Sequence, residues 1–214
     1  MLRPTKPKYD NIWDPAVVLD YLRGLKNSEI SIDTLTHKLT ALLALATGQR
    51  LQTLTLIEIS NIYRDTKGLT ITIPSRIKTS GRNRLQPVLR LPFLDLDPEI
   101  CVARTVLLYI NKTEVRRGSV RFLILSTRKP FHKATAQTLS RWIKIILQKS
   151  GVDVTKFSAY STRHAATSAA SRKGLNFDTI RLSAGWSQNS NMFATVYNRP
   201  ICSDKSFAET VLGD

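Results

Sequence analysis

The hydrophobic pattern of the chain changes its period in the middle, and this change limits the folds that the chain can adopt. From Thr135, apolar residues recur at helical spacing and would line one face of a helix: Leu139, Trp142, Ile143, Ile146 and Leu147. Residues 69–73 (LTITI) instead alternate as in a half-buried strand, and residues 87–91 (PVLRL) would pair with them. We therefore expect a mainly α fold with a small antiparallel β-sheet, in the α+β class.

Capping residues and glycines mark the boundaries of the other expected elements. Asp14 and Pro15 form a helix start, because aspartate caps free backbone N–H groups and proline suits the first helical position. Gly48 is placed to end the next helix. The two strands are joined by a basic tip that contains glycine (75–84, SRIKTSGRNR). The remaining expected elements are helices near 33–46, 51–58, 98–110, 165–170, 178–184 and 203–212, and a strand at 121–125.

The charge of the chain indicates a polyanionic partner. There are 32 Lys and Arg residues against 16 Asp and Glu residues, which gives a formal net charge of +16. Such an excess repels itself in a folded protein and is usually neutralised by a polyanion. Nucleic acid is the expected partner, because neutralising phosphates releases counterions. An anionic membrane is the alternative, but the longest apolar run (39–47) is too short to span a bilayer, and the basic residues do not gather on one amphipathic helix.

The sequence contains no pattern typical of a metal site or of secretion. Cys101 and Cys202 lack zinc or CxxC spacing and are expected to be reduced thiols. Asp95, Asp97 and Glu99 lie close together, but we expect Asp97 to cap the helix that follows and Glu99 to complement its dipole. The first eleven residues lack the apolar core of a secretory signal. We expect an intracellular protein that needs no metal and no cofactor.

Four short stretches contain residues suited to chemistry on phosphate: TGQR (47–50), IKTSG (77–81), YSTRH (160–164), and AGWS (184–187) with a later VYNRP (196–200). Each alone indicates little, since single Arg and Lys residues in a basic protein are usually solvated. In this order they resemble the tyrosine recombinase, or phage integrase, family over residues 12–201. The matching residues are Arg50, Lys78, Arg163, Trp186 and Tyr197. The chain most resembles recombinases of eukaryotic mobile elements of the Crypton and DIRS type, which implies a nuclear protein.

The resemblance implies the tyrosine recombinase catalytic-domain fold and a role for each matching residue. Arg50 and Arg163 would clamp the non-bridging oxygens of a scissile phosphate, because guanidinium stays protonated and binds oxyanions in a planar fork. Tyr197 would attack phosphorus to form a 3′-phosphotyrosine, so that rejoining needs no ATP. Lys78 would protonate the 5′-oxygen leaving group as a general acid. Trp186 would pack beside the phosphate and donate its indole N–H.

The sequence departs from the family pattern at the HxxR motif, where Tyr160 stands in place of the histidine. A phenol has an ordinary pKa of about 10 and is a poor general base at neutral pH. The adjacent His164 either compensates for the missing histidine or is a structural histidine on the helix. It is also a candidate DNA contact. Thr53 replaces an acidic residue that is frequent after the first arginine. We also expect the segment that contains the nucleophile (189–198) to be mobile.

We also have expectations for the DNA contacts, the domains and the assembly of the protein. Arg76, Arg82 and Arg84 on the hairpin tip are the main candidate phosphate contacts, with Arg116, Arg117 and Lys133 as others. We expect residues 1–12 to be a basic linker or the end of a missing N-terminal DNA-binding domain. Residues 13–201 would then form the catalytic domain, and residues 202–214 a tail that docks on a neighbouring subunit.

The resulting functional hypothesis is a site-specific recombinase or transposase that acts on double-stranded DNA as a homo-oligomer, and the resemblance implies a tetramer. Two alternatives stay open at the level of sequence. One is a DNA-binding protein that keeps the recombinase fold but has lost catalysis, for which Tyr160 is the best argument. The other is a type IB topoisomerase, which would relax supercoils as a monomer without site preference.

Overall fold

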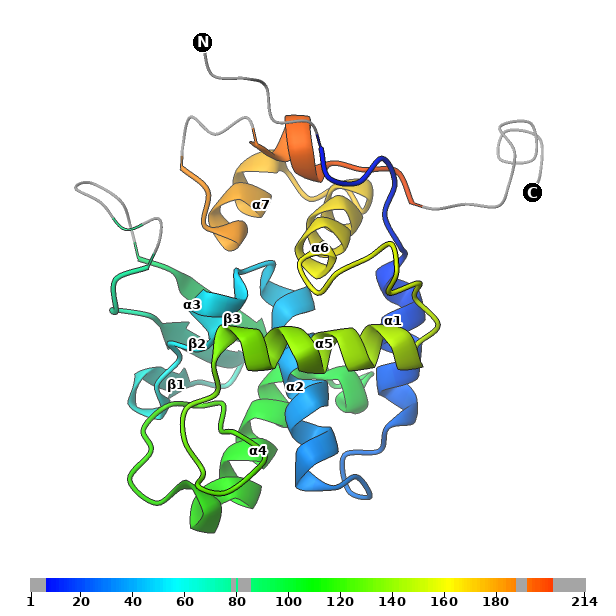
Figure 1. Cartoon of the computed structure of the whole chain (residues 1–214). Helices are drawn as coiled ribbons and strands as arrows, with labels where there is room; N and C mark the ends of the chain where they lie inside the picture. Colours follow the sequence, from blue (N-terminus) through cyan, green and yellow to red (C-terminus); the bar gives the residue numbers. More distant parts are fainter. Residues whose placement is uncertain (1–6, 78–79, 81–85, 188–191, 202–214) are drawn as a thin grey trace.

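The computed structural model describes residues 7–77, 80, 86–187 and 192–201. Within these ranges the chain is mainly helical, with a small antiparallel sheet at one side (Figure 1). The helices are α1 (Pro15–Gly24), α2 (Ile32–Thr47), α3 (Leu51–Leu54), α4 (Val102–Arg117), α5 (Ala136–Lys149), α6 (Ser161–Arg172) and α7 (Phe177–Ala184). Short 3-10 helices occupy Ile59–Asn61 (η1) and Pro98–Ile100 (η2), and a π-helix occupies Phe193–Tyr197 (η3).

The core is built around α2, which lies behind α5 in Figure 1 and also packs against α4 and α6. Ser31 caps the start of α2, where its side chain accepts from the N–H of Thr34. Gly48 ends the helix in the left-handed conformation, with φ of +59°. The apolar stripe predicted for α5 is confirmed, because all five of its residues are buried: Leu139, Trp142, Ile143, Ile146 and Leu147.

The sheet contains, among the described residues, the strands β1 (Ile62–Arg64), β2 (Gly68–Thr72) and β3 (Val88–Pro92) in that order. The predicted pairing of the last two is confirmed as antiparallel, with Ile71 opposite Leu89. Alternation along β3 buries Leu89 and Leu91 and exposes the residues between them. This face packs on α4, so the fold is the mainly α arrangement with a small antiparallel sheet that the sequence predicts.

Two expected elements differ from the observed ones. The helix predicted at 51–58 ends at Leu54. Residues 121–125 form isolated bridges, Glu58 with Phe122 and Leu125 with Lys133, rather than a strand.

Two charged side chains before α4 also have partners other than those expected. Asp97 does not cap η2 but accepts from Arg23 of α1, with Nε to Oδ2 at 2.8 Å. Glu99 accepts from the N–H of Asn27 at 2.8 Å and pairs with the buried Lys38 at 3.5 Å. The two acidic groups therefore fasten the α1–α2 region to the start of α4, because each satisfies a donor that the packing brings within reach.

The described N-terminal segment is part of the packed domain. Tyr9 and Ile12 are buried in the main core, and the Tyr9 hydroxyl lies 2.9 Å from Ser158 Oγ. The N–H of Ile12 donates to the carbonyl of Pro200 at 2.8 Å, and the two ends of the described chain run side by side there (Figure 1). Trp13 Nε1 donates to Ser161 Oγ at 2.8 Å. The packed region therefore includes Tyr9 and Ile12, and residues 202–214 lie outside the described ranges.

No helix in the described ranges combines the length and apolar character needed to cross a bilayer. Within the same ranges, no three His, Cys, Asp or Glu side chains are grouped as metal ligands.

Candidate active site

The site forms where the start of α6 meets the end of α2. Arg163, one turn into α6, donates from Nη1 to the carbonyl of Gly48 at 2.7 Å. A Cβ at Gly48 would lie 3.4 Å from Thr167 Cγ2, so glycine also allows α6 to approach closely. Arg50 follows two residues later as the N-cap residue of α3 and is partly exposed. The charge of Arg50 lowers the pKa of Arg163, so the structure brings the two predicted arginines into one electrostatic environment.

The guanidinium of Arg163 is buried against two aromatic rings. Its Cζ lies 4.7 Å from the ring centroid of Trp186 and 5.3 Å from that of Tyr197. Burial lowers the pKa of Arg163 to about 10, while the Tyr197 hydroxyl opposes this shift. The group is therefore still charged at neutral pH. Its Nε and Nη2 are buried and make no hydrogen bond of ordinary geometry to the described residues.

Tyr197 is the last residue of η3 and is held in place through its backbone. Ser168 Oγ of α6 donates to the Tyr197 carbonyl at 2.6 Å and accepts from the N–H of Arg199 at 3.0 Å. The side chain is only 2% exposed, and its hydroxyl forms a hydrogen bond with the hydroxyl of Tyr160. The described part of the segment that we expect to be mobile is thus packed against α6 near Tyr197. In this conformation the Tyr197 hydroxyl is covered.

Tyr160 covers the Tyr197 hydroxyl from the solvent side. It is the N-cap residue of α6, without a capping hydrogen bond from its side chain, and is 45% exposed. Burial, followed by the hydrogen bond to Tyr197, raises the pKa of Tyr160 to about 12. The charges of Arg163 and Arg50 act in the opposite direction. A phenol with this pKa keeps its proton at neutral pH.

His164 is enclosed by aromatic rings and has no exposed surface. Its ring stacks on Tyr197 with centroids 4.3 Å apart at 27°, and the ring of Tyr9 meets it edge-on at 5.1 Å. Burial, and next the charge of Arg163, lowers the pKa of His164 to about 4. We correct the proposal that His164 contacts DNA, because a fully buried ring presents no surface to a phosphate. The alternative, a structural histidine, agrees with this burial.

Trp186 completes the enclosure of Tyr197 from the end of α7. Gly185 ends that helix with φ of +67°, and the indole ring follows with its centroid 4.7 Å from that of Tyr197. The Trp186 Nε1 is buried and makes no hydrogen bond to any residue in the described ranges. The predicted contact of Trp186 with a phosphate stays a prediction.

Two polar residues position α7 against the arginine-bearing turn, and sequence reasoning did not single them out. Gln49 Nε2 donates to the carbonyl of Ser183 at 2.6 Å. Ser183 Oγ in turn donates to the carbonyl of Thr47 at 3.1 Å. Gln49 lies within the TGQR stretch, and its position next to Arg50 is the sequence feature that could have identified it.

Only one of the four predicted residues on the hairpin tip lies within the described ranges. Lys78, Arg82 and Arg84 lie outside the described residues, whereas Arg76 is described and exposed. The base of the tip is closed by the N–H of Ile73, which donates to the carbonyl of Pro87 at 3.2 Å. The tip therefore joins β2 and β3, as expected.

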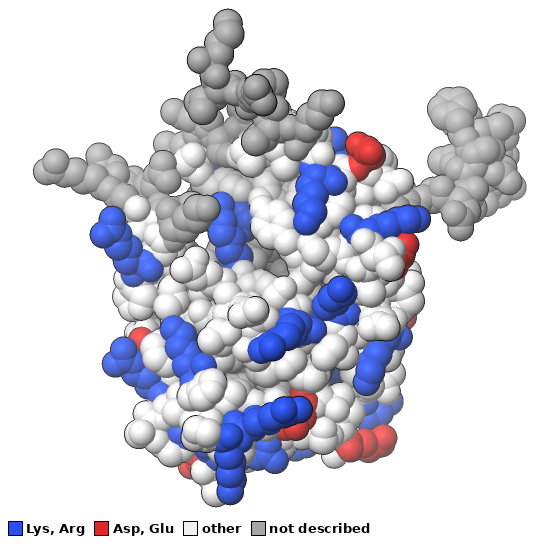
Figure 2. Space-filling model, viewed as in Figure 1, with Lys and Arg blue, Asp and Glu red and all other residues white. Residues whose placement is uncertain are grey.

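Positive charge is widespread on the face shown in Figure 2, where acidic side chains are few. Helix α5 crosses the front of this view and has exposed basic residues at Arg141, Lys144 and Lys149. Of the other candidate contacts, Arg117 is buried and donates to the carbonyl of Leu123 at 3.1 Å, so it has a structural role. Arg116 pairs with Asp33 at 3.3 Å.

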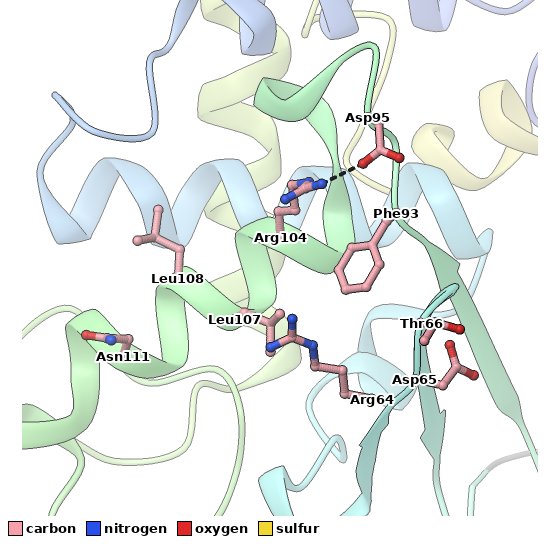
Figure 3. A pocket seen from close by; sticks show the side chains of 9 residues that line it. All are labelled: Arg64, Asp65, Thr66, Phe93, Asp95, Arg104, Leu107, Leu108 and Asn111. Atoms are coloured by element: carbon pink, nitrogen blue, oxygen red, sulfur yellow. Dashed lines mark hydrogen bonds and ion pairs between the residues drawn. The ribbon is translucent and has the colours of Figure 1, made fainter.

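A cavity of about 610 Å³ lies elsewhere, between α4 and the sheet (Figure 3). The Phe93 ring lies near the guanidinium groups of both Arg64 and Arg104, whose Cζ atoms are 5.8 and 5.4 Å from the ring centroid. Arg104 is paired with Asp95 at 2.5 Å. None of the predicted site residues that the structure describes lines this cavity, so it is separate from the candidate active site.

Comparison with known proteins identifies the family and the fold of the chain. Residues 20–201 match the model of the phage integrase family. The structure is similar to that of XerH site-specific recombinase bound to its difH substrate before cleavage, at 16% identity and a TM-score of 0.64, covering 97% of this chain and 55% of that chain. A lambda integrase (75–356) dimer bound to a COC′ core site shares 18% identity, with a TM-score of 0.60 and coverage of 96% and 66%.

A third similar structure is the Tn1549 transposon integrase (residues 82–397) in complex with circular intermediate DNA. It shares 13% identity at a TM-score of 0.56, covering 99% of this chain and 66% of that chain. This chain thus spans about half to two thirds of these proteins. No curated protein matches the sequence. At these identities the likeness shows the fold, which is that of tyrosine recombinase catalytic domains.

Proposed function

The chain belongs to the phage integrase family, and we propose that it breaks and rejoins double-stranded DNA through a 3′-phosphotyrosine intermediate, without metal or ATP. The observation that carries this proposal is the position of Arg163 beside Tyr197, with Arg50 acting on the same site. Similar folds occur in XerH bound to difH and in lambda integrase bound to a core site. The net charge of +16 supports DNA as the partner.

The chemistry follows from the charge that develops at phosphorus. Tyr197 gives its phenolic proton to solvent, and attack by its oxygen forms a bond to phosphorus and breaks the bond to the 5′-oxygen, which takes up a proton from Lys78. Negative charge grows on the non-bridging oxygens, where the two arginines would stabilise it. Arg163 suits this role because two of its donors are buried without an ordinary hydrogen bond to the described residues. Rejoining is the reverse reaction, in which the 5′-hydroxyl displaces Tyr197.

The covered hydroxyl of Tyr197 is the observation that favours the inactive alternative. At 2% exposure, the Tyr197 oxygen is covered in this conformation, so Tyr197 and the Tyr160 bonded to it have to shift together to admit a phosphate. The half-exposed Tyr160 ring has solvent on one side, which gives it room to move. We infer that binding of a phosphate drives this movement. The anion is attracted to the guanidinium groups of both Arg50 and Arg163, and this attraction favours the conformation that admits it.

A library of nicked duplexes, in which only a short strand separates the cleavage site from the nick, tests the proposal. Cleavage releases the short strand and traps the covalent protein–DNA adduct, which a denaturing gel resolves. We expect an adduct with the wild-type chain and none with Tyr197→Phe, although both bind DNA. Binding without an adduct in the wild type would support the inactive DNA-binding protein. Relaxation of supercoiled DNA by monomers without paired sites would support the type IB topoisomerase.

We propose further that the protein acts as a homo-oligomer on DNA, as a tetramer in the complete reaction, and that it acts in the nucleus. A lambda integrase tetramer bound to a Holliday junction has a similar fold. Deleting the residues after Pro200 should impair synapsis of two sites more than cleavage of one. Equal loss of both activities would count against docking of this tail on a neighbour.

A further inference from the structure

Tyr160 has a position that the family resemblance does not explain, because a tyrosine stands where the pattern has histidine. Its hydroxyl forms a hydrogen bond with that of Tyr197, the atom that would attack phosphorus. The two rings are 6.2 Å apart at 59°, so the contact is made by the hydroxyl groups and not by ring stacking. Tyr160 therefore touches the reacting atom directly.

The direction of this hydrogen bond follows from which phenol keeps its proton. Burial and the bond to Tyr197 raise the pKa of Tyr160 to about 12, which disfavours its ionisation at any physiological pH. If Tyr197 loses its proton to attack, Tyr160 can only be the donor of the shared hydrogen bond. A donor stabilises an oxyanion and does not accept its proton.

Each of the other polar side chains around the Tyr197 ring interacts with a group other than the Tyr197 oxygen. His164 stacks on the face of that ring and is neutral, since its pKa is lowered to about 4. Arg163 is tied to Gly48 through Nη1, and its remaining donors are the groups that would hold a phosphate. Arg199 is turned away, because its guanidinium donates to the carbonyls of Thr195 and Val196.

We propose that Tyr160 is a catalytic residue that donates its O–H to the oxygen of Tyr197 and stabilises it as the nucleophile. This inference rests on the proposed DNA cleavage. Tyr197 gives its proton to solvent, its oxygen bonds to phosphorus, and the electron pair of the broken bond goes to the 5′-oxygen, which is protonated. Tyr160 keeps its own proton throughout. Its role is therefore on the nucleophile side of the reaction, unlike that of Lys78 on the leaving-group side.

A substrate with sulfur in place of the bridging 5′-oxygen separates the two sides. A thiolate leaves without a proton, so this substrate relieves a defect in the general acid but not a defect in the nucleophile. Single-turnover adduct formation would be measured with both nicked substrates, at saturating protein, for the wild type, Tyr160→Phe and Lys78→Ala. Tyr63→Phe is the matched control, because Tyr63 is 56% exposed and lies on β1, away from the site.

We expect Tyr160→Phe to form the adduct about 10- to 100-fold more slowly with both substrates, as for loss of one hydrogen bond to a charged group. Its DNA affinity and thermal midpoint should match those of Tyr63→Phe, which shows that the fold is retained. Tyr160→His, which also offers a donor, should recover part of the rate. Lys78→Ala should be slow only with the oxygen substrate.

Three results would overturn the inference. A Tyr160→Phe rate equal to that of the wild type would show that the shared hydrogen bond is not used. Recovery of Tyr160→Phe by the sulfur substrate would place Tyr160 at the leaving group instead. Absence of any adduct with the wild type would refute the proposed function itself. This failure can be told apart from failure of the inference, because it is seen with the wild type alone and not in a comparison of variants.

Discussion

Acidification should destabilise the domain through His164. The ring is fully buried beside Tyr197, Tyr9 and Tyr160, where protonation would place a charge without water. Burial, and then the charges of Arg163, Arg199 and Lys8, lowers its pKa from 6.5 to about 4. His164 in the unfolded chain thus takes up a proton near pH 6.5, whereas His164 in the folded chain is protonated only near pH 4.

The sign and size of the effect follow from this difference in proton binding. Protons favour the unfolded state between the two pKa values, so stability is complete above pH 6.5 and is lost as the pH falls toward 4. From about pH 8 to pH 5, one such histidine costs about 2 kcal/mol of the free energy of unfolding. Total stabilities of about 5–15 kcal/mol are usual, so this loss is measurable.

Urea denaturation at a series of pH values, for the wild type and His164→Phe, isolates this contribution. Phenylalanine keeps an aromatic ring against Tyr197 but cannot titrate. The wild type should lose about 2 kcal/mol more than the variant over this range. Some pH dependence should persist in the variant, because burial also lowers the pKa of His37. Parallel curves for the two proteins would refute the reasoning, since His164 would then protonate as easily in the folded chain.

The remaining predictions concern the groups around this ring. Arg163→Lys should slow adduct formation at least about 100-fold, because an ammonium cannot reproduce the planar fork; a rate within a few-fold of the wild type would contradict the clamp. Ser168→Ala leaves the buried carbonyl of Tyr197 without its donor and should cost about 1–3 kcal/mol in urea denaturation, whereas an unchanged midpoint would argue against this anchor. Gly48→Ala forces a left-handed alanine beside Thr167 and should lower Tm by about 2–8 °C. If Tm is unchanged, the backbone conformation of Gly48 is not the one described.

Much of the fold could be predicted because its determinants are local. The stripe of α5, the Asp14 cap of α1 and the alternation in β2 each depend on residues within a few positions of one another. The bounds of the edge strand β1 could not be predicted, because it has only three residues and exists through pairing with β2. Asp97 was misassigned for the same reason, since its partner Arg23 lies 74 residues away.

The candidate site could be named but not assembled from the sequence. Motif order indicated Arg50, Arg163, Trp186 and Tyr197, yet their mutual placement depends on contacts between distant segments. Ser168 holds the Tyr197 carbonyl, and that contact has no signal in the local sequence. Burial was the least predictable property, as the enclosed His164 shows, because it depends on three rings from separate parts of the chain.

Peptide mapping of the trapped adduct tests the central claim most directly. Trypsin places Tyr197 and Tyr160 in different peptides, because Arg163 and Arg181 lie between them. After nuclease treatment, mass spectrometry should find the residual 3′-linked nucleotide on the peptide that contains Tyr197. A nucleotide on the peptide that contains Tyr160, or a linkage through a 5′-phosphate, would contradict the account.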